Sequence, residues 1–402
     1  MRLVHISTTD HGGAGNAAWR IHRACRSAGD DSTLLVAERS RDDPSVLTAA
    51  ASPAGKARLK VLSWLNSRDG RPGFSPSRWC GLRVSRHPLV KKADAVALYW
   101  IADGFADLAD LADIRVPVLW RLSDLWPFTG GCHYPGTCEG YRSRCDACPL
   151  LQQRPARGFA IRERAWRAFR PLIVAPSRWI AGHAARSSLF GHLRIEVVHT
   201  GVDLSVYRPI DRRLARTVLG LDPDRTLLGF AAQRFTADPR KGFSHLVEAL
   251  RRLAVTGVRP ELLAWGGPTD QPPGLDLPLP VHWLGMLHDE RLMALCYAAC
   301  DAVVVPSLED NLPNTALEAL ACGTPVAGFS AGGLADAVDS EVGSLAATAD
   351  ADGLARSIGS LLSSGGVLGQ AARRRAEERF DLRIQAGRIR ALLTELTEAA
   401  CR

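Results

Sequence analysis

The sequence predicts an α/β protein made of two doubly wound, parallel-sheet domains that face one another across a cleft. Its 402 residues exceed the ~250–300 at which one hydrophobic core stops growing, so two domains are expected. Short β-branched runs alternate with segments of helical periodicity, as in βαβ units. The pattern starts again after the turn Thr200-Gly201-Val202-Asp203, which places the domain boundary near residue 200.

Each element has its own signal. In the first helix Ala17, Ile21 and Ala24 recur at helical spacing, and Gly29 follows where a helix ends. The strands of the first half are expected at Leu3–Ser7, Thr33–Ala37, Ala95–Tyr99, Pro117–Leu122 and Leu172–Ala175. Those of the second half are expected at Leu227–Ala232, Glu261–Trp265, Val281–Leu284, Ala302–Val305 and Val326–Phe329.

These elements give three parts. We predict an N-terminal domain over residues 1–195, with a cysteine-rich insert at 130–150, and a second domain over residues 196–375. A C-terminal helix over residues 376–402 follows the second sheet and could pack back toward the N-terminal domain.

Charge is distributed unevenly between the two halves. The net charge of +8 divides into +13 for residues 1–195 and −5 for residues 196–402. Residues 56–92 hold ten basic side chains and one acid, interleaved with Trp64, Phe74 and Trp79. An arginine-rich codon bias is the alternative cause, since only five of the 50 basic residues are lysines. The clustering favours an anionic membrane surface as a partner of residues 56–92.

Composition excludes several classes of protein. An apolar content of 46% and a charged content of 23% are typical of a globular protein and argue against disorder. We find no apolar run suited to a signal peptide or long enough to span a membrane, so we expect a cytoplasmic protein, peripheral on the inner face of the cell membrane. Ten cysteines in that setting favour reduced thiols or a metal site over a disulfide framework.

Ligands of open α/β sheets bind beyond the carboxyl ends of the strands, so the loops there are candidate sites. Gly12 and Gly13 precede the first helix, where backbone amides can receive an anion; a tight strand–helix turn is the alternative. Arg234, Arg240 and Lys241 lie beside the start of a later helix and suit a diphosphate. A solvated basic loop is the alternative for these three.

A third loop and its helix carry two carboxylates, Asp310 and Glu318. Along a continuous helix, eight residues at ~1.5 Å each would separate them by about 12 Å. Glycosidase pairs need ~5 Å for retention and under ~10 Å for inversion, so the spacing argues against hydrolysis by this pair. Two carboxylates that accept hydrogen bonds from sugar and ribose hydroxyls fit better.

A fourth loop contains Ser123, Asp124 and His133 and then a cysteine cluster. The cysteine spacing is C-x5-C-x6-C-x2-C, and four thiolates so close in sequence could hold a structural zinc ion. Free buried thiols or partial disulfides are the alternative. The four residues are Cys132, Cys138, Cys145 and Cys148.

Together these motifs resemble the retaining glycosyltransferases of family 4, which have the GT-B fold, and most closely their bacterial exopolysaccharide and colanic-acid type. The resemblance covers nearly the whole chain, and the region from Pro306 to Pro325 is its most specific part because it matches the E-x7-E signature. It implies a metal-independent hexosyltransferase. The donor would be a UDP- or GDP-sugar, and the acceptor a lipid-linked saccharide, a polysaccharide or a natural product.

The resemblance also implies roles for individual residues. Lys241, with Arg234 or Arg240, would pair with the diphosphate, and Gly12 and Gly13 would close on it from the first domain. No divalent cation would be required, so these groups would stabilise the leaving diphosphate.

The signature region would bind the rest of the donor. Glu318 would hold the ribose hydroxyls and Asp310 would lie near the donor sugar, although the family has Glu where this chain has Asp310. Many members have His where this chain has Ser123, directly before Asp124. His133 could replace that histidine, or it could be structural. The remaining candidate donor-binding residues are Asn311, Leu312 and Asn314.

Two alternatives belong to other functional classes. A zinc-stabilised nucleic-acid-binding protein would use the basic half and the cysteines. It is disfavoured because the basic diphosphate loop lies in the acidic half, so we expect no nucleic acid as a partner. A GT-B phosphorylase, or a GT-B protein without transfer activity, is the second alternative.

Overall fold

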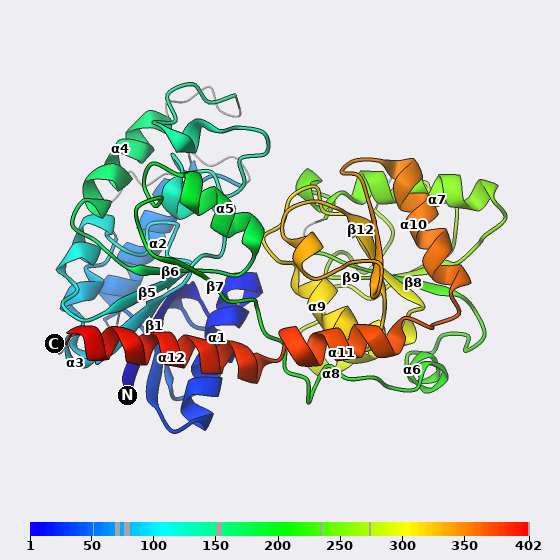
Figure 1. The fold of residues 1–402 in the computed structure, drawn as a ribbon, viewed down its shortest axis with the longest axis horizontal. Helices are drawn as coiled ribbons and strands as arrows, with labels where there is room; N and C mark the ends of the chain where they lie inside the picture. The colour runs from blue at the N-terminus through cyan, green and yellow to red at the C-terminus, as the bar shows by residue number, and fades with distance from the viewer. Residues whose placement is uncertain are drawn as a thin grey trace. The chain divides into compact units, whose positions relative to one another are not determined.

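The computed structural model describes residues 1–50, 52–68, 73–75, 81–149, 155–233, 235–272 and 275–400. They form two compact units, shown in Figure 1, where the colour runs from blue at the N-terminus to red at the C-terminus. Unit 1 comprises Met1–His199 with Arg383–Arg402, and unit 2 comprises Thr200–Leu382. The predicted domain boundaries lie after residues 195 and 375. Arg234 and Trp79, which the sequence analysis singled out, lie outside the described residues.

Unit 1 is built on a seven-stranded sheet in the order β3-β2-β1-β4-β5-β6-β7. Every neighbouring pair of strands is parallel. The chain order reverses between β1 and β4, which is the place where open α/β sheets bind ligands. The strands are β1 Arg2–Thr9, β2 Asp31–Glu38, β3 Val46–Thr48, β4 Ala95–Leu98, β5 Val118–Arg121, β6 Leu172–Ala175 and β7 Ile195–Val197.

Helices cover both faces of this sheet, because successive side chains of a strand point to opposite faces and both sets are apolar here. Leu3, Leu34 and Leu119 pack with α1 and α12 on one face. Ile6 and Trp120 belong to the core on the other face, with α4 and α5. The helices of unit 1 are α1 Gly12–Ser27, α2 Pro53–Arg68, α3 Pro88–Lys92, α4 Pro155–Trp166, α5 Arg178–Arg186 and α12 Leu382–Ala400.

The last helix therefore completes the first unit. From Arg383 onward α12, red in Figure 1, lies beside α1 and contributes Ile389, Leu392 and Leu393 to the core under the sheet. Arg390 also pairs with Asp30 at an Nε–Oδ2 distance of 2.5 Å.

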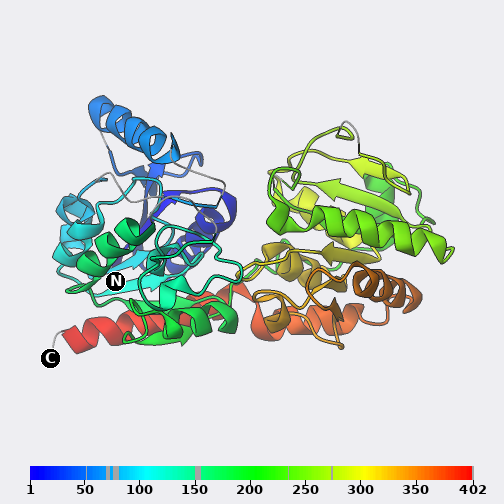
Figure 2. The same cartoon turned by 90° about the horizontal axis from the view of Figure 1, so that it is seen from above.

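Unit 2 repeats the architecture with a six-stranded parallel sheet in the order β10-β9-β8-β11-β12-β13. Helices α7 and α10 pack on one face and α8, α9 and α11 on the other, and Figure 2 shows these layers. The strands are β8 Leu227–Ala231, β9 Glu261–Trp265, β10 Val281–Trp283, β11 Ala302–Val305, β12 Val326–Phe329 and β13 Gly343–Ala346. The helices are α6 Arg212–Val218, α7 Phe243–Val255, α8 Glu290–Ala299, α9 Asn314–Ala321, α10 Ala351–Ser363 and α11 Gly369–Arg379.

The predicted fold class, two doubly wound parallel-sheet domains, is confirmed. All ten predicted strands are present, and three further strands, β3, β7 and β13, were not predicted. None of the helices in the described part of the chain is long and apolar enough to cross a membrane.

Candidate functional site

The carboxyl ends of β8 and β11 in unit 2 bring two of the predicted loops together. Lys241 Nζ lies 2.7 Å from Asp310 Oδ2. Arg240 donates to the backbone oxygen of Glu309 at 2.8 Å, and its own backbone oxygen accepts from the amide of Leu308 at 2.8 Å. The basic loop with Arg240 and Lys241 thus packs directly against the loop with Asp310, which we call the signature loop. This contact puts positive charge at the edge of the sheet where ligands bind.

Gly242 makes this approach of the two loops possible. Its φ of 68° lies in the left-handed region, and a Cβ placed on it would come within 1.8 Å of the backbone oxygen of Pro306. Only glycine satisfies both conditions. Helix α7 begins at the next residue, so Gly242 fixes the helix start against the signature loop.

Asp310 is the electrostatic centre of the two joined loops. Burial acts to raise its pKa, but the charges of Lys241 and Arg240 outweigh this effect and hold the pKa below its ordinary value. The amide of Asn311 donates to Asp310 Oδ1 at 3.0 Å. The carboxylate is therefore held ionised and oriented as the counter-ion of Lys241.

Helix α9 presents its amino terminus beside this ion pair. Pro313 precedes the helix, and no side chain caps it. Within the described chain, no hydrogen bond is recorded from the amides of Asn314 and Thr315. Uncapped amides at a helix amino terminus attract anions. Asn311 and Leu312, also predicted as donor-binding residues, are buried at this loop.

Glu318 lies further along α9, and it is only 6% exposed. Its Oε2 accepts a hydrogen bond from the hydroxyl of Tyr297 at 3.0 Å. Burial, and then the nearby Glu318 charge, raise the pKa of Tyr297 well above its ordinary value. Tyr297 therefore stays protonated and donates to the carboxylate. The sequence analysis did not identify Tyr297, because it lies in α8, away from the signature region.

The glycine loop of unit 1 lies between β1 and α1. Gly12 has a φ of 68°, and both Gly12 and Gly13 face open space. Gly15, which the sequence analysis did not single out, is the tightly packed member: a Cβ there would lie 2.7 Å from the backbone oxygen of Thr9. The two predicted glycines thus leave their backbone accessible, whereas Gly15 lets the helix approach the strand.

Asp10 and Arg41 organise the same loop. Asp10 is fully buried and accepts hydrogen bonds from the amides of Ser40 and Arg41. Burial acts to raise the pKa of Asp10, but the hydrogen bond from the Ser40 hydroxyl at 2.6 Å and those from the two amides hold it below its ordinary value. The Arg41 side chain donates to Asp10 O and to Asn16 Oδ1. It thereby places a cation beside the glycine loop.

Asp124 and His133 meet at the carboxyl end of β5. His133 Nδ1 lies 2.6 Å from Asp124 Oδ2, and His133 Nε2 lies 2.8 Å from the hydroxyl of Ser75. Ser75 in turn donates to Asp103 at 2.6 Å, and the Trp100 indole donates to Asp124 at 3.0 Å. Both ring nitrogens of His133 are engaged within unit 1, which favours the structural interpretation of this histidine. Ser123 is half-buried directly before Asp124.

Asp103, Ser75 and Trp100 were absent from the sequence analysis. Asp103 has a φ of 57°, a conformation that non-glycine residues adopt rarely. It follows β4 closely, where the loop-after-strand rule had been applied only to other strands. Ser75 lies 58 residues before His133 in the sequence, and no local pattern connects the two.

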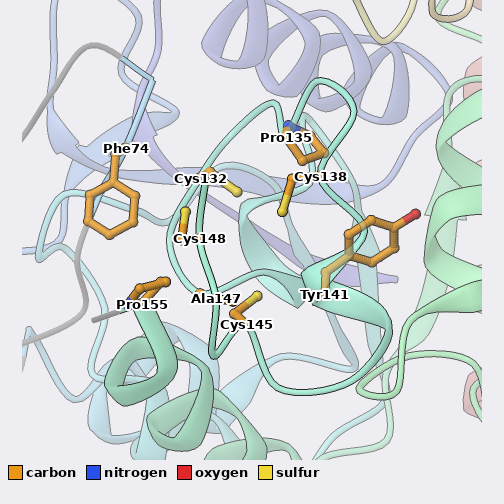
Figure 3. A pocket seen from close by; sticks show the side chains of 10 residues that line it. Phe74, Cys132, Pro135, Cys138, Tyr141, Cys145, Ala147, Cys148 and Pro155 are labelled. Carbon is orange, nitrogen blue, oxygen red and sulfur yellow. The ribbon is translucent and has the colours of Figure 1, made fainter. Parts of the chain in front are cut away.

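The four predicted zinc ligands do come together. Figure 3 shows Cys132, Cys138, Cys145 and Cys148 around one small cavity, whose volume is about 10 Å³. They are free thiols. Burial, more than the neighbouring thiols, raises the pKa of Cys132 to about 12 and that of Cys145 to about 11.

The geometry does not support the zinc prediction. Among the described residues, which include all four cysteines, no group of three or more His, Cys, Asp or Glu side chains is arranged to hold a metal ion. Cys145 is buried, and the other three free thiols are half-buried.

The chain resembles known proteins in two ways, the first of which is sequence similarity over part of its length. Residues 225–364 match the family "Glycosyl transferases group 1". A D-inositol 3-phosphate glycosyltransferase from Mycobacterium marinum is 37% identical over 202 residues, covering 46% of this chain and 41% of that protein. The enzyme of the same name from Mycobacteroides abscessus is 40% identical over 181 residues, covering 42% and 39%. The match thus spans about two fifths of each relative, and their names refer to an inositol phosphate rather than to colanic acid.

The second likeness is structural and covers both units. Sucrose-phosphate synthase from Thermosynechococcus elongatus superimposes with a TM-score of 0.69 at 18% identity, over 99% of each chain. HepE from Anabaena, solved with UDP-glucose, gives 0.64 at 16% identity over 98% of this chain and 99% of that one. WaaG, a glycosyltransferase of lipopolysaccharide biosynthesis, gives 0.65 at 17% identity over 98% and 99%. Residues 225–364 are thus similar in sequence to the group 1 glycosyltransferases, and the chain as a whole has the GT-B fold.

Proposed function

We propose that this chain is a retaining glycosyltransferase of family 4 that takes its sugar from a UDP- or GDP-sugar. The observation that carries the proposal is the Lys241–Asp310 pair beside the uncapped start of α9, within the residues that match group 1 glycosyltransferases. The acceptor class we propose is a lipid-linked saccharide, a polysaccharide or a natural product.

Different residues of unit 2 bind different parts of the donor. Lys241 exchanges part of its contact with Asp310 for the diphosphate, assisted by Arg240 and the α9 amides, which neutralise the charge that develops on the leaving group. Asp310 then keeps the lysine in place and faces the donor sugar. Glu318, oriented by Tyr297, accepts hydrogen bonds from the ribose hydroxyls. In unit 1, the accessible backbone of Gly12 and Gly13 suits a phosphate group.

The first experiment offers a panel of UDP- and GDP-sugars and detects hydrolysis or transfer by mass. D-inositol 3-phosphate is included as an acceptor because the curated relatives carry that name. Lys241→Ala and Glu318→Gln are expected to lower turnover by roughly 100-fold or more, as loss of a transition-state contact does. Arg259→Ala, a substitution of an exposed arginine of unit 2, is the control and should keep full activity.

Two results would contradict the proposal. One is that the purified protein neither binds nor turns over any donor of the panel. The other is that Lys241→Ala retains wild-type turnover. Activity that persists in excess chelator would support the metal-independent mechanism, and activity lost with the chelator and restored by a divalent cation would contradict it.

We also propose that residues 56–92 contact an anionic membrane surface. In α2, Val61 and Trp64 are 54% and 55% exposed, and Lys56 and Lys60 lie on the same helix. Exposed apolar side chains among basic ones are typical of interfacial helices. In a liposome flotation assay, the protein should prefer anionic over neutral vesicles. Trp64→Ser should weaken this preference, whereas Val255→Ser should not, although Val255 is 88% exposed. Equal recovery with both vesicles would contradict the proposal.

A further inference from the structure

Unit 2 contains a large cavity that the proposed donor site does not use. Its volume is about 520 Å³, within the ~300–1,000 Å³ that small-molecule sites occupy. Ala298 of its lining precedes β11 and Thr324 precedes β12, so the cavity lies at the amino ends of the strands. The Lys241–Asp310 pair lies at the carboxyl ends. The two sites are therefore on opposite edges of one sheet.

The lining of this cavity is positively charged. It contains three arginines and no acidic residue: Arg212 from α6, and Arg373 and Arg374 from α11. Arg212 Nη1 pairs with Asp301 at 2.8 Å, and Arg373 Nε pairs with Glu377 at 2.7 Å. These acids lie outside the lining.

Two features suggest that the positive groups are available to a ligand. The Nε of Arg212 is buried and has no hydrogen-bond partner among the described residues, and a buried donor without a partner costs about 1–3 kcal/mol. Arg374 is exposed, and no ion pair to another described side chain is recorded for it. A planar guanidinium with free donors matches the oxygens of a phosphate.

The start of α11 adds backbone donors to the same cavity. The helix has 11 residues, and Leu368 before it provides no side-chain cap. Within the described chain, no hydrogen bond is recorded from the amides of Gln370 and Ala371. Gly366 and Gly369 line the cavity, and Gly366 leaves room beside Arg212: a Cβ there would lie 3.6 Å from the guanidinium. Backbone and side-chain donors thus converge on one space.

We propose that this cavity binds a small molecule through a phosphate group. Arg374 and the α11 amides hold the phosphate, Arg212 and Arg373 supply further positive charge, and Pro209 and Ile210 form an apolar wall for the rest of the ligand. The site is separate from the proposed donor site, and its existence does not depend on glycosyl transfer.

The test measures the binding of inorganic phosphate by thermal shift and calorimetry, at constant ionic strength with chloride as the reference. Gln370→Glu keeps the size of the side chain and favours the helix start, but it places a negative charge at the cavity. Arg374→Glu reverses an exposed charge. Each substitution is expected to weaken phosphate binding by about fivefold or more. Arg259→Glu, which reverses an exposed arginine of unit 2 outside the cavity, should change binding by less than about twofold.

Lys241→Ala separates this site from the donor site. The proposal requires that this variant still binds phosphate while its affinity for UDP-sugars falls. If Lys241→Ala alone abolishes phosphate binding, the anion goes to the donor loop and the proposal is wrong. It is equally wrong if wild-type protein shows no response, or if Gln370→Glu and Arg374→Glu bind phosphate as the wild type does. Glucose 6-phosphate then tests the rest of the ligand: tighter binding than inorganic phosphate identifies a phosphorylated sugar, and equal binding identifies the phosphate group alone.

Discussion

Asp310 and Lys241 form an ion pair, and the lysine charge helps to keep the Asp310 carboxylate ionised. The pair matters for function because a lysine held by a buried carboxylate is positioned before any diphosphate arrives. Side-chain exposure is 13% for Asp310 and 22% for Lys241, so loss of one charge leaves the other poorly solvated. Such a loss costs about 1–3 kcal/mol.

Asp310→Asn should therefore destabilise unit 2 by that amount at neutral pH. The pKa of Asp310 is lowered in the folded state, so its stabilisation is present above the ordinary pKa of about 3.9 and is lost as the pH falls through the folded pKa. The difference in the free energy of unfolding between this variant and the wild type should become smaller below about pH 4. Urea unfolding at several pH values measures it, with Asp224→Asn, at an exposed ion pair with Arg213, as the control. A pH-independent difference would contradict the electrostatic explanation.

The thiols of Cys132 and Cys145 lead to a second prediction at the scale of single residues. Because the pKa is about 12 for Cys132 and about 11 for Cys145, iodoacetamide should alkylate both slowly in the native protein at neutral pH. The rate should rise as the pH approaches 10. Mass spectrometry of timed digests measures it for each cysteine. Protection that persists at high pH and disappears with a chelator would contradict the free-thiol description and restore the zinc prediction.

Single residues also show where sequence reasoning ends. Lys241, Asp310 and Glu318 stand out because their motifs are local, and the structure places the first two in contact. Tyr297 orients Glu318 from another helix, and Ser75 and Asp103 reach His133 only through the fold. No periodicity or spacing records a contact between segments that are distant in sequence.

At the scale of elements, the joint between β8, α7 and the signature loop depends on Gly242. Gly242→Ala should disrupt it, because the new Cβ would overlap the Pro306 oxygen as well as strain the backbone. We expect the free energy of unfolding to fall by more than about 2 kcal/mol and the binding of UDP-sugars to weaken strongly. Gly257→Ala is the matched control: its φ is 86°, but nothing lies within 4 Å of its Cβ position, so only about 1 kcal/mol of backbone strain is expected. Equal effects of the two substitutions on urea unfolding and on donor binding would contradict the steric argument.

The elements that were not predicted share a physical reason. β3, β7 and β13 have three or four residues each, and each pairs with only one neighbouring strand at a sheet edge. Short edge strands need few apolar residues, so Gly343–Ala346 lacks the β-branched run that identifies β11. Central strands such as Ala302–Val305 are buried on both faces, and their composition alone identifies them.

At the scale of the whole molecule, the two units should respond differently to acid. Burial lowers the pKa of His5 to about 3 and that of His22 to about 4, and both lie in unit 1. The stabilisation that each neutral histidine provides is fully present above the ordinary pKa of about 6.5. Below that pH, the free energy of unfolding falls by up to about 1.4 kcal/mol per pH unit for each histidine. Hydrogen exchange between pH 7.5 and 5 should show unit 1 destabilised more than unit 2. His22→Gln should flatten this pH dependence, whereas His192→Gln, at an exposed site, should not.

The path of the chain makes unit 1 discontinuous, because its last helix is synthesised after all of unit 2. Leu392 and Leu393 are at most 1% exposed under the unit 1 sheet, and truncation of a buried leucine costs about 2–5 kcal/mol. Leu392→Ala with Leu393→Ala should therefore lower the unfolding free energy of unit 1 and leave unit 2 nearly unchanged, since the lost contacts belong to the core around Leu3 and Ile21. Hydrogen exchange resolved by unit distinguishes this outcome from a single cooperative loss across both units. The latter would mean that α12 stabilises the chain as one body, and it would contradict the assignment of α12 to the first core alone.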